Sequence, residues 1–419
     1  MNKGDKRVLV VGSGGRCHAI VDALSRSPQV AKIFCAPGNA GIAMQADCVA
    51  IGVEEVDRLV EFAREERIDL TVIGPEASLA AGVVNAFKSA GMRAFGPTKE
   101  AAQIESSKEF AKRLMAKYDI PTAGYEAFSD FEPAWNYVQH RPLPAVIKYD
   151  GLAAGKGVVV AESYEEAEAA LRDMLLDESF GGGRVVVEDF LDGPEFSFMC
   201  VVSGEKVYPL AMAQDHKRAY DGDKGPNTGG MGAYSPVPFV TEEVRQFALD
   251  RIMYPTAKAM VAEGVPFVGV LYGGLILTKE GPKVIEFNAR FGDPETEVVL
   301  PRLESDIYEL FDAAIDGRDC DTTWSNDALL GVVMASKGYP GSYAKGVRID
   351  GLENVESKVY HMGTAMKNGE LVTAGGRVLM VMGRAATLAE AKQMAEKGCK
   401  TIECDGLFHR SDIGHKVLN

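Results

Sequence analysis

Late in the sequence, side chains that can supply oxygen ligands alternate with a guanidinium. On a strand, the stretch VIEFNARFGDPE puts Glu286, Asn288 and Arg290 on one face, while Ile285 and Phe287 point to the core. Carboxylate and amide oxygens suit Mg²⁺ or Mn²⁺, and a guanidinium suits the phosphate oxygens that such an ion bridges. A solvated polar strand face is the alternative interpretation.

A lysine and a glycine-rich loop form a second pattern. Lys148 lies in the strand-like run Ala145–Tyr149, and the loop that follows reads DGLAAGKG, with Lys156 near its end. Such a loop between two strands can fold over nucleotide phosphates, and Lys148 can put a fixed charge on a phosphate oxygen. It is not a Walker A loop, because G-x-x-x-x-G-K-[ST] does not occur. A solvated lysine beside a flexible loop is the alternative.

The third pattern is an apolar strand that runs into carboxylates and a Gly-Pro turn, VVVEDFLDGPE, from Val185 to Glu195. Its backbone can hydrogen-bond an adenine edge while a carboxylate takes ribose hydroxyls, which suits a hinge beside a nucleotide. An ordinary strand–turn–strand connection has the same pattern.

A charged cluster precedes a second glycine-rich loop. QDHKR, at Gln214–Arg218, is followed by NTGGMG, an unusual concentration of cations on an acidic chain. A zwitterionic or phosphorylated substrate would suit it. A solvated charge cluster is the alternative.

The turn GSGGR at Gly12–Arg16 follows the opening apolar strand. Its glycines let the backbone approach an anion, and the next helix offers free N–H groups, so a phosphate-bearing ligand is favoured. The dinucleotide fingerprint G-x-G-x-x-G is incomplete, because Cys17 holds its sixth position. A purely structural tight turn stays open.

Alternating strands and helices are expected to position the N-terminal turns. Apolar runs predict strands at Arg7–Gly12, Ile33–Ala36, Val49–Val53 and Leu70–Ile73, with helical spacing between them. This alternation predicts a doubly wound parallel sheet, with the turns at Pro37–Asn39 and Gly74–Glu76 at its ligand-binding carboxyl edge.

The rest of the chain predicts an α/β and α+β multidomain protein. A polar helix is expected over Lys99–Tyr118, and a small α+β lobe with a helix at Tyr164–Leu176 is inserted in a larger domain. That domain continues with a long helix near Thr241–Glu263 and strands at Phe267–Leu277 and Lys283–Phe287. We therefore expect three domains, 1–103, 104–325 (with the lobe at about 125–193) and 326–419.

Composition narrows the functional classes. The 419 residues include 60 Asp and Glu against 45 Lys and Arg, a net charge of −15, which argues against a nucleic-acid partner. The seven cysteines show no metal-binding spacing and are expected to be reduced thiols of a cytoplasmic protein. Neither a secretory signal nor a membrane-spanning run is expected.

The order of lysine-bearing strand, glycine loop, acidic hinge and Glu-x-Asn strand resembles the ATP-grasp ligases. More closely, the chain is similar to the phosphoribosylamine–glycine ligase family (glycinamide ribonucleotide synthetases) of purine biosynthesis. The resemblance is carried, over nearly the whole chain, by VLVVGSGGR, APGNAG, GPEASLAAG, FGPTKEAAQIESSK, IKYDGLAAGKGVVVA, VEDFLDGPEFS, QDHKRAYDGDKGPNTGGMGAYSP, VIEFNARFGDPE, GRVLMV and FHRSDIGH.

The resemblance implies that ATP activates glycine as an acyl phosphate, which the amine of 5-phosphoribosylamine then attacks. It implies ATP as co-substrate with Mg²⁺ or Mn²⁺, small-molecule partners only, and a monomer. The ATP site would comprise Lys108, Lys148, Gly151, Gly155, Lys156, Gly157, Glu188, Asp189, Phe190, Leu191 and Glu195. The substrate pocket would comprise Gly12, Gly14, Gly15, Arg16, Gly38, Asn39, Gly74, Pro75, Glu76 and His216. Glu286 and Asn288 would bind the metal, and Arg290, Asp215 and Lys217 would be catalytic.

The sequence departs from the family pattern in three places. Cys17 stands where the family usually has an acid, and Tyr149 where alanine is usual. Many ATP-grasp enzymes bring a second metal carboxylate from the preceding strand, but Val268–Leu277 holds no acid. Two rival hypotheses remain: an ATP-grasp ligase or carboxylase that uses another acid, and a dehydrogenase or non-catalytic protein based on the Gly12 turn alone.

Overall fold

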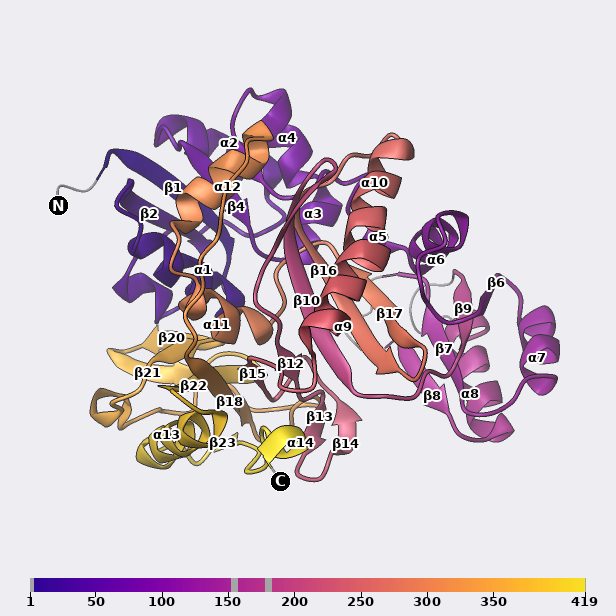
Figure 1. Ribbon diagram of the computed structural model, residues 1–419. Coiled ribbons are helices and arrows are strands. Elements are labelled where there is room, and N and C mark those ends of the chain that lie inside the picture. The colour runs from indigo at the N-terminus through magenta and orange to yellow at the C-terminus, as the bar shows by residue number, and fades with distance from the viewer. Residues whose placement is uncertain (1–3, 152–156, 178–182, 419) are drawn as a thin grey trace.

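The computed structural model describes residues 4–151, 157–177 and 183–418. An antiparallel sheet lies in the middle of the molecule, with the N-terminal and C-terminal parts on its left and a small lobe on its right in Figure 1. Its strands, in spatial order, are β11 (Lys206–Pro209), β10 (Glu195–Ser203), β16 (Val268–Thr278) and β17 (Gly281–Asn288).

The N-terminal part is the predicted parallel sheet, in the order β3-β2-β1-β4-β5. The strand order reverses between β1 and β4, so the turns that follow these two strands meet at the carboxyl edge, where such sheets bind ligands. Its elements are β1 (Lys6–Gly12), α1 (Gly15–Ser25), β2 (Val30–Pro37), η1 (Ile42–Met44), β3 (Asp47–Cys48), α2 (Val56–Glu65), β4 (Leu70–Ile73), α3 (Glu76–Ala81), α4 (Val83–Ser89) and β5 (Ala94–Phe95).

The strand predicted at Val49–Val53 is wrong. The strand β3 comprises only Asp47–Cys48, and the chain turns at once, with Ile51 N donating to Val49 O at 2.7 Å. Ile51 is buried and Val53 O accepts a hydrogen bond from Ser78 Oγ at 2.7 Å, so the segment packs as a loop. A loop that buries alternate apolar side chains has the same sequence pattern as a strand.

The helix predicted over Lys99–Tyr118 is broken into α5 (Gln103–Ser106) and α6 (Lys108–Lys117). Ser107 between them is extended, and its Oγ caps α6 by accepting from Phe110 N at 3.1 Å. Because of this break, residues on both sides of Ser107 reach the cavity described below.

The small lobe is a four-stranded antiparallel sheet, in the order β6-β9-β7-β8, with two helices. Its buried residues, among them Ile147, Leu171 and Val187, form a hydrophobic core separate from those of the rest of the molecule. Its elements are β6 (Tyr125–Phe128), α7 (Phe131–Gln139), β7 (Ala145–Tyr149), β8 (Val158–Ala161), α8 (Tyr164–Leu175) and β9 (Val185–Asp189).

A β-bulge interrupts β17 next to its functional residues. Gly274 of β16 pairs with Glu286 and Leu275 pairs with Val284, which leaves Ile285 as the extra residue. The prediction that Ile285 points to the core is therefore wrong, because Ile285 is half-buried and lines the cavity. Phe287 is 3% exposed and belongs to the hydrophobic core, as predicted, although it also borders the cavity.

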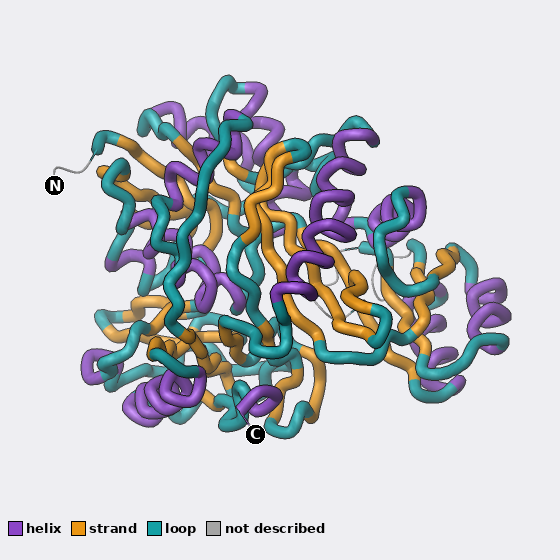
Figure 2. Tube along the Cα trace, in the orientation of Figure 1, coloured by secondary structure: helices purple, strands orange, loops and turns teal. Residues whose placement is uncertain are grey.

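The long helix predicted near Thr241–Glu263 is present as α9 (Glu242–Ala248), a π-helical turn (Leu249–Met253) and α10 (Tyr254–Ala262), which cross one face of the central sheet (Figure 2). After β17 come α11 (Glu295–Val299), η3 (Leu300–Arg302) and α12 (Ile307–Asp316). The last of these returns to the N-terminal part, where Phe311 stacks on Phe95 at 4.1 Å between ring centroids.

The C-terminal sheet, in the order β12-β15-β18-β22-β19, crosses the boundary predicted at residue 326, because β12 and β15 precede it in the chain. No described helix has the length and apolar character needed to span a membrane. The elements of this part are β12 (Gln214–Asp215), β13 (Arg218–Tyr220), β14 (Lys224–Asn227), β15 (Gly232–Ser235), β18 (Ala328–Ser336), η4 (Leu352–Asn354), β19 (Val359–His361), β20 (Thr364–Lys367), β21 (Glu370–Thr373), β22 (Arg377–Ala385), α13 (Leu388–Thr401), β23 (Leu407–Phe408) and α14 (His415–Leu418).

Two buried histidines join the N-terminal and C-terminal parts. His18 Nδ1 of α1 accepts a hydrogen bond from His361 N of β19 at 2.9 Å, and the two rings lie 5.7 Å apart. Burial, with smaller contributions from His361 and Lys358, lowers the pKa of His18 to about 3. Burial, assisted by Lys358, lowers the pKa of His361 to about 4. Both imidazoles are therefore neutral in the folded protein at neutral pH.

This contact predicts a loss of stability in acid. Since the folded pKa of His18 lies below the unfolded value of about 6.5, its contribution is complete above pH 6.5 and is lost as the pH falls towards 3. At pH 5, protonation of this histidine in the unfolded state lowers the free energy of unfolding by about 2 kcal/mol. Urea unfolding of His18→Gln between pH 5 and 8 should show a flatter pH dependence, with the exposed His140→Gln as control; an unchanged slope would contradict it.

Candidate active site

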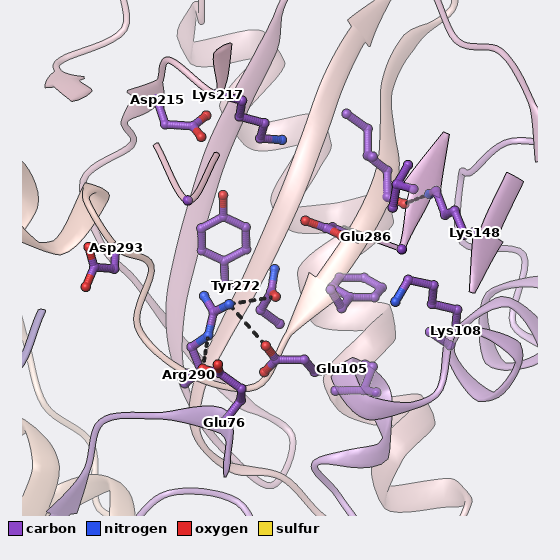
Figure 3. A pocket seen from close by; sticks show the side chains of 18 of the residues that line it. Glu76, Glu105, Lys108, Lys148, Asp215, Lys217, Tyr272, Glu286, Arg290 and Asp293 are labelled. Carbon is purple, nitrogen blue, oxygen red and sulfur yellow. Dashed lines mark hydrogen bonds and ion pairs between the residues drawn. The ribbon is translucent and has the colours of Figure 1, made fainter. Parts of the chain in front are cut away.

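One cavity collects charged side chains from the N-terminal turns, α5, α6, the lobe, the central sheet and the C-terminal part (Figure 3). Among the described residues its positive and negative charges balance. A triphosphate would therefore need an accompanying cation to avoid excess negative charge. The charged lining residues are Arg16, Lys108, Lys112, Lys148, Lys217, Arg290 and Arg377 against Glu76, Glu105, Glu188, Asp215, Glu286, Asp293 and Glu295.

Two buried lysines share one carboxylate at the end of the cavity nearest the lobe. Glu188 of β9 pairs with Lys112 and with Lys148 of β7, each at 2.8 Å. Lys148 Nζ also donates to Ile285 O at 2.9 Å, the carbonyl that the bulge in β17 releases from the sheet. Burial lowers the pKa of Lys112 to about 8, although Glu188 opposes this shift. One carboxylate between two lysines leaves positive charge for an anion.

The first turn of α6 is fixed to the start of the glycine-rich loop. Lys108 N and Glu109 N both donate to Asp150 Oδ1, at 2.5 and 3.2 Å, and Lys108 Nζ donates to Gly151 O at 3.2 Å. Burial lowers the pKa of Lys108, although Glu286 opposes this shift. The arrangement directs a second cation at the cavity from the same side as Lys148 (Figure 3).

Part of the predicted loop is described. Gly155 and Lys156 lie outside the described residues. Gly157 lines the cavity, and its carbonyl oxygen accepts a hydrogen bond from Tyr149 N at 2.8 Å. The unusual Tyr149 is buried and sits between the loop ends, since it is the nearest side chain to Gly151.

Of the predicted adenine hinge, Glu188 reaches the cavity lining. Asp189 instead pairs with Arg141 at 3.1 Å, and the Phe190 ring is 44% exposed. Among the described residues, the hinge side chains outside the lining are Asp189, Phe190, Leu191 and Glu195.

Glu286 and Asn288 fit a divalent cation. They face the cavity from β17, and carboxylate and amide oxygens are ligands that Mg²⁺ prefers. Burial would raise the pKa of Glu286, but nearby Lys217, Lys148 and Lys108 outweigh burial and hold it below its usual value. The described residues contain no cluster of three acidic, histidine or cysteine ligands, so phosphate oxygens and water would complete the coordination.

Arg290 begins a chain of ion pairs that links the central sheet to the N-terminal turns. It pairs with Glu105 at 3.1 Å and with Glu76 at 3.5 Å (Figure 3). Glu76 also pairs with Arg16 at 3.3 Å, and Arg16 with Asp293 at 3.8 Å. Burial would lower the pKa of Arg290, but Glu105 and Glu76 raise it above its usual value. The guanidinium is thus held charged beside the proposed metal ligands.

The predicted N-terminal pocket divides into residues that reach the cavity and residues that hold the turns. Arg16 and Glu76 line the cavity. Gly15 lies against the buried carboxyl of Glu297, and a Cβ there would collide with it. Among the described residues, the predicted pocket members outside the lining are Gly12, Gly14, Gly15, Gly38, Asn39, Gly74, Pro75 and His216.

Cys17 and Asn39 contact other parts of the protein and do not line the cavity. The Cys17 thiol is buried where the turns after β1 and β4 meet, and a Cβ on either Gly12 or Gly74 would collide with its sulfur. Burial raises the pKa of Cys17 to about 12, so the thiol is neutral. Asn39 Nδ2 donates to the backbone oxygens of Ser13, at 2.6 Å, and of His361 in the C-terminal part, at 2.8 Å.

The QDHKR segment divides by strand alternation. Asp215 and Lys217 line the cavity, whereas His216 is 0% exposed on the other side, where its Nε2 accepts from Gly414 N at 3.1 Å. Burial raises the pKa of Asp215 to about 7, although Lys217 lowers it. Lys217 pairs with Glu195 at 2.8 Å. Asp215 can therefore exchange a proton near neutral pH.

Tyr272 and Glu295 form a buried network beside Asp215. Tyr272 OH donates to Glu295 Oε1 at 2.6 Å, and Ser197 Oγ donates to the same oxygen at 2.9 Å. Burial raises the pKa of Tyr272, as do Glu295 and Asp215. The network fixes the side of the cavity where a small substrate would meet Asp215.

Comparison with known proteins identifies the family. Domain profiles of phosphoribosylglycinamide synthetase match residues 6–105 (N domain), 106–296 (ATP-grasp domain) and 329–416 (C domain). The chain belongs to the phosphoribosylglycinamide synthetase family. It is 53% identical to the phosphoribosylamine–glycine ligase of Halalkalibacterium halodurans, over 98% of this chain and 97% of that one, and 52% identical to that of Salmonella typhimurium, over 98% and 99%.

Solved structures agree with the family fold. The crystal structure of phosphoribosylamine–glycine ligase from Thermotoga maritima superimposes with a TM-score of 0.87 at 34% identity, over 97% of this chain and 100% of that one. The biotin carboxylase domain of Hydrogenobacter thermophilus 2-oxoglutarate carboxylase, in complex with MgADP and bicarbonate, has a TM-score of 0.72 at 17% identity, over 96% and 91%. The second likeness shows the ATP-grasp fold alone.

Sequence reasoning missed several residues that line the cavity. Tyr272 and Arg377 lie within apolar strands, where a single polar residue gives no periodic signal. Glu105 and Asp293 stand inside motifs that the family resemblance covers, but neither has a partner nearby in sequence. The missed lining residues with charged or phenolic groups are Glu105, Lys112, Tyr272, Asp293, Glu295, Tyr339 and Arg377.

Proposed function

We propose that the chain joins glycine to 5-phosphoribosylamine with ATP, giving glycinamide ribonucleotide, ADP and phosphate. The observation that carries the proposal is the position of Glu286 and Asn288, which face the same cavity as Lys108 and Lys148 on one side and Asp215 on the other. A metal-binding pair between phosphate-binding cations and a titratable carboxyl suits transfer of a phosphoryl group to a carboxylate.

In the first step, a glycine carboxylate oxygen attacks the γ-phosphorus of ATP and ADP leaves. Lys148 and Lys108 neutralise the phosphate oxygens, and Arg290 stabilises charge on the transferring group or on the glycine carboxylate. Glu286 and Asn288 would hold Mg²⁺ or Mn²⁺, which would supply further neutralisation of the phosphate charge. The product of this step is glycyl phosphate, a mixed anhydride with an activated carbonyl carbon.

In the second step, the amine of phosphoribosylamine attacks that carbonyl carbon, and phosphate leaves. The attacking nitrogen must lose a proton, and Asp215, with a pKa of about 7, is a suitable acceptor at neutral pH. Arg16 and Glu76, at the carboxyl ends of β1 and β4, line the part of the cavity assigned to the phosphoribosyl group. Lys217, which lines the cavity and is held by Glu195, would orient the glycine carboxylate.

An isotope experiment tests the proposed chemistry. With glycine labelled by ¹⁸O in its carboxylate, one labelled oxygen should appear in the inorganic phosphate, because the C–O bond to the transferred phosphoryl group breaks in the second step. Phosphate release should require glycine and phosphoribosylamine together. Unlabelled phosphate would contradict an acyl phosphate, and turnover with bicarbonate or another acid in place of glycine would favour a different ATP-grasp activity.

The role proposed for Asp215 predicts how the catalytic rate depends on pH. A proton acceptor must be deprotonated, so kcat/KM for phosphoribosylamine should rise as the pH increases through about 7. Asp215→Asn should lower the plateau roughly 10²-fold and abolish that limb. Asp250→Asn is the matched control, because the Asp250 carboxylate is exposed and accepts a hydrogen bond from Gln246. An unchanged acid limb in Asp215→Asn would assign the titration to another group.

The proposed partners are small molecules only. The choice between Mg²⁺ and Mn²⁺, the monomeric state and the cytoplasmic location stay predictions from the sequence. Titration of the apo chain with each metal, in the presence of a nonhydrolysable ATP analogue, would compare the two ions directly.

A further inference from the structure

A buried arginine of the C-terminal segment lies behind the cavity and does not line it. Arg410 is 1% exposed, although it carries a full charge. Its Nε and Nη2 donate to the two carboxylate oxygens of Asp412 at 2.7 and 2.9 Å. Its Nη1 donates to Arg218 O and to Asp223 Oδ1, both at 2.9 Å. The planar guanidinium thus holds these three partners in fixed directions.

The partners of Arg410 belong to the segment that carries Lys217. Arg218 is the next residue after Lys217, and Asp223 lies in the turn of the hairpin formed by β13 and β14. Asp412 Oδ2 accepts from Gly222 N of the same turn at 2.8 Å. The hairpin is therefore held by the C-terminal segment at its start and at its tip.

Neighbouring contacts complete the attachment. On the other side of Lys217, His216 Nε2 accepts from Gly414 N at 3.1 Å. Lys217 O accepts from Thr228 N at 2.7 Å and from Thr228 Oγ1 at 2.8 Å, which ties it to the returning strand of the hairpin. The residues before, at and after Lys217 are each fixed by the backbone or by the C-terminal segment.

The charge of Lys217 in turn sets the electrostatics of the cavity. Its ammonium pairs with Glu195 and lies near Asp215 and Glu286. It lowers the pKa of Asp215 against burial and against the charges of Glu295 and Glu195, and Lys416 of the C-terminal segment acts in the same direction with a smaller effect. It also lowers the pKa of Glu286 against burial. A displacement of Lys217 would therefore change how two other cavity residues titrate.

We propose that Arg410 is a positioning residue, which acts from outside the cavity to hold Lys217 where it meets Asp215 and Glu195. The inference rests on the proposed function and gives the C-terminal segment a part in it. Burying a guanidinium with these partners is also compatible with a purely structural role, which would lower stability but leave the properties of the remaining folded enzyme unchanged. The two roles differ in measurable ways.

Arg410→Lys keeps the charge but loses the fork of donors. Asp223→Asn removes a half-buried negative charge that Arg410 shares with His415 and Lys416. For Arg410→Lys we expect kcat/KM for glycine and phosphoribosylamine to fall roughly tenfold to a hundredfold, the cost typical of a small misplacement. The acid limb of the pH profile should move to higher pH, because Asp215 loses the nearby cation. ATP affinity by calorimetry should be unchanged. Asp223→Asn should shift the same quantities in the same direction, by less.

Arg348→Gln is the matched control, since Arg348 belongs to the same part and also pairs with two carboxylates, Asp350 and Glu370, but at the surface. It should show no shift of the pH profile. A loss of stability in Arg410→Lys and Asp223→Asn with an unmoved pH profile would overturn the proposal, as would wild-type kinetics in both.

A readout independent of turnover separates this proposal from the proposed function. Competitive acetylation with acetic anhydride, followed by peptide mass spectrometry, reports the reactivity of Lys217 relative to the exposed Lys206. Lys217 should react faster in Arg410→Lys, because its carboxylate partners raise its pKa only while it is held near them. If the wild type fails to ligate glycine, the proposed function fails; if Lys217 reactivity is unchanged, the positioning role fails.

Discussion

Glu286→Gln is expected to lower the ligation rate by about 10³-fold or more while the protein keeps its fold. The substitution preserves volume but removes the charged member of the pair Glu286 and Asn288, so these two side chains would offer a divalent cation neutral oxygens alone. It also removes a negative charge that lies near Lys217, Lys148 and Lys108. Phosphate release at saturating ATP, glycine and phosphoribosylamine, measured with circular dichroism of the same sample, checks the effect.

A matched control lies in the turn of the same hairpin. Glu280, in the turn between β16 and β17, is exposed and pairs with Lys283. Glu280→Gln should therefore retain full activity. Excess Mn²⁺ should partly restore Glu286→Gln if the defect is metal affinity. Near-normal turnover of Glu286→Gln at low metal concentration would remove Glu286 from the metal site.

The regular parts of the fold were predictable because their signals are local. The apolar runs of β1 and β4 and the glycines after them predict a parallel sheet, which is confirmed. Ligand binding at its carboxyl edge stays a prediction. The break at Ser107 and the bulge at Ile285 were not predicted. A single residue decides each of them, through a side-chain cap or an extra residue in one strand, and neither changes the periodicity around it.

The predicted site residues differ in how far their partners lie along the chain. Glu286, Asn288 and Arg290 are close in sequence, and all three reach one cavity, the first two from β17 and Arg290 from the bend that follows it. Alternation in QDHKR also places His216 opposite its neighbours, a signal that the prediction of a substrate contact for His216 did not use.

Other contacts depend on tertiary packing. Lys112 and Glu188 are joined across the α6–lobe contact, and Arg377 reaches the cavity only because the C-terminal sheet continues that of β12 and β15. No pattern within a window of sequence contains both partners of such a pair. The family resemblance covers these segments but gives no distance between them.

Lys148→Met is expected to weaken ATP binding by about 10³-fold, which corresponds to about 4 kcal/mol for loss of a buried charge facing phosphate. Lys148 is 3% exposed and its ammonium is fixed by Glu188 and Ile285 O, so no conformational freedom has to be lost when the nucleotide arrives. Calorimetric titration with a nonhydrolysable ATP analogue and metal measures the affinity. Lys206→Met, at the exposed edge strand β11, is the control.

The same lysine also stabilises the fold, and a double-mutant cycle with Glu188→Gln separates the two effects. In the unfolding free energy the two substitutions should couple, because Lys148→Met leaves Glu188 with Lys112 alone, whereas both changes together remove the charge that needed a partner. In the ATP-binding free energy the loss caused by Lys148→Met should persist in the Glu188→Gln background, because its cause is the missing contact with phosphate. If the affinity loss instead disappears when Glu188 is neutral, Lys148 acts on ATP only by screening the charge of Glu188. The proposed direct contact between Lys148 and phosphate would then be wrong.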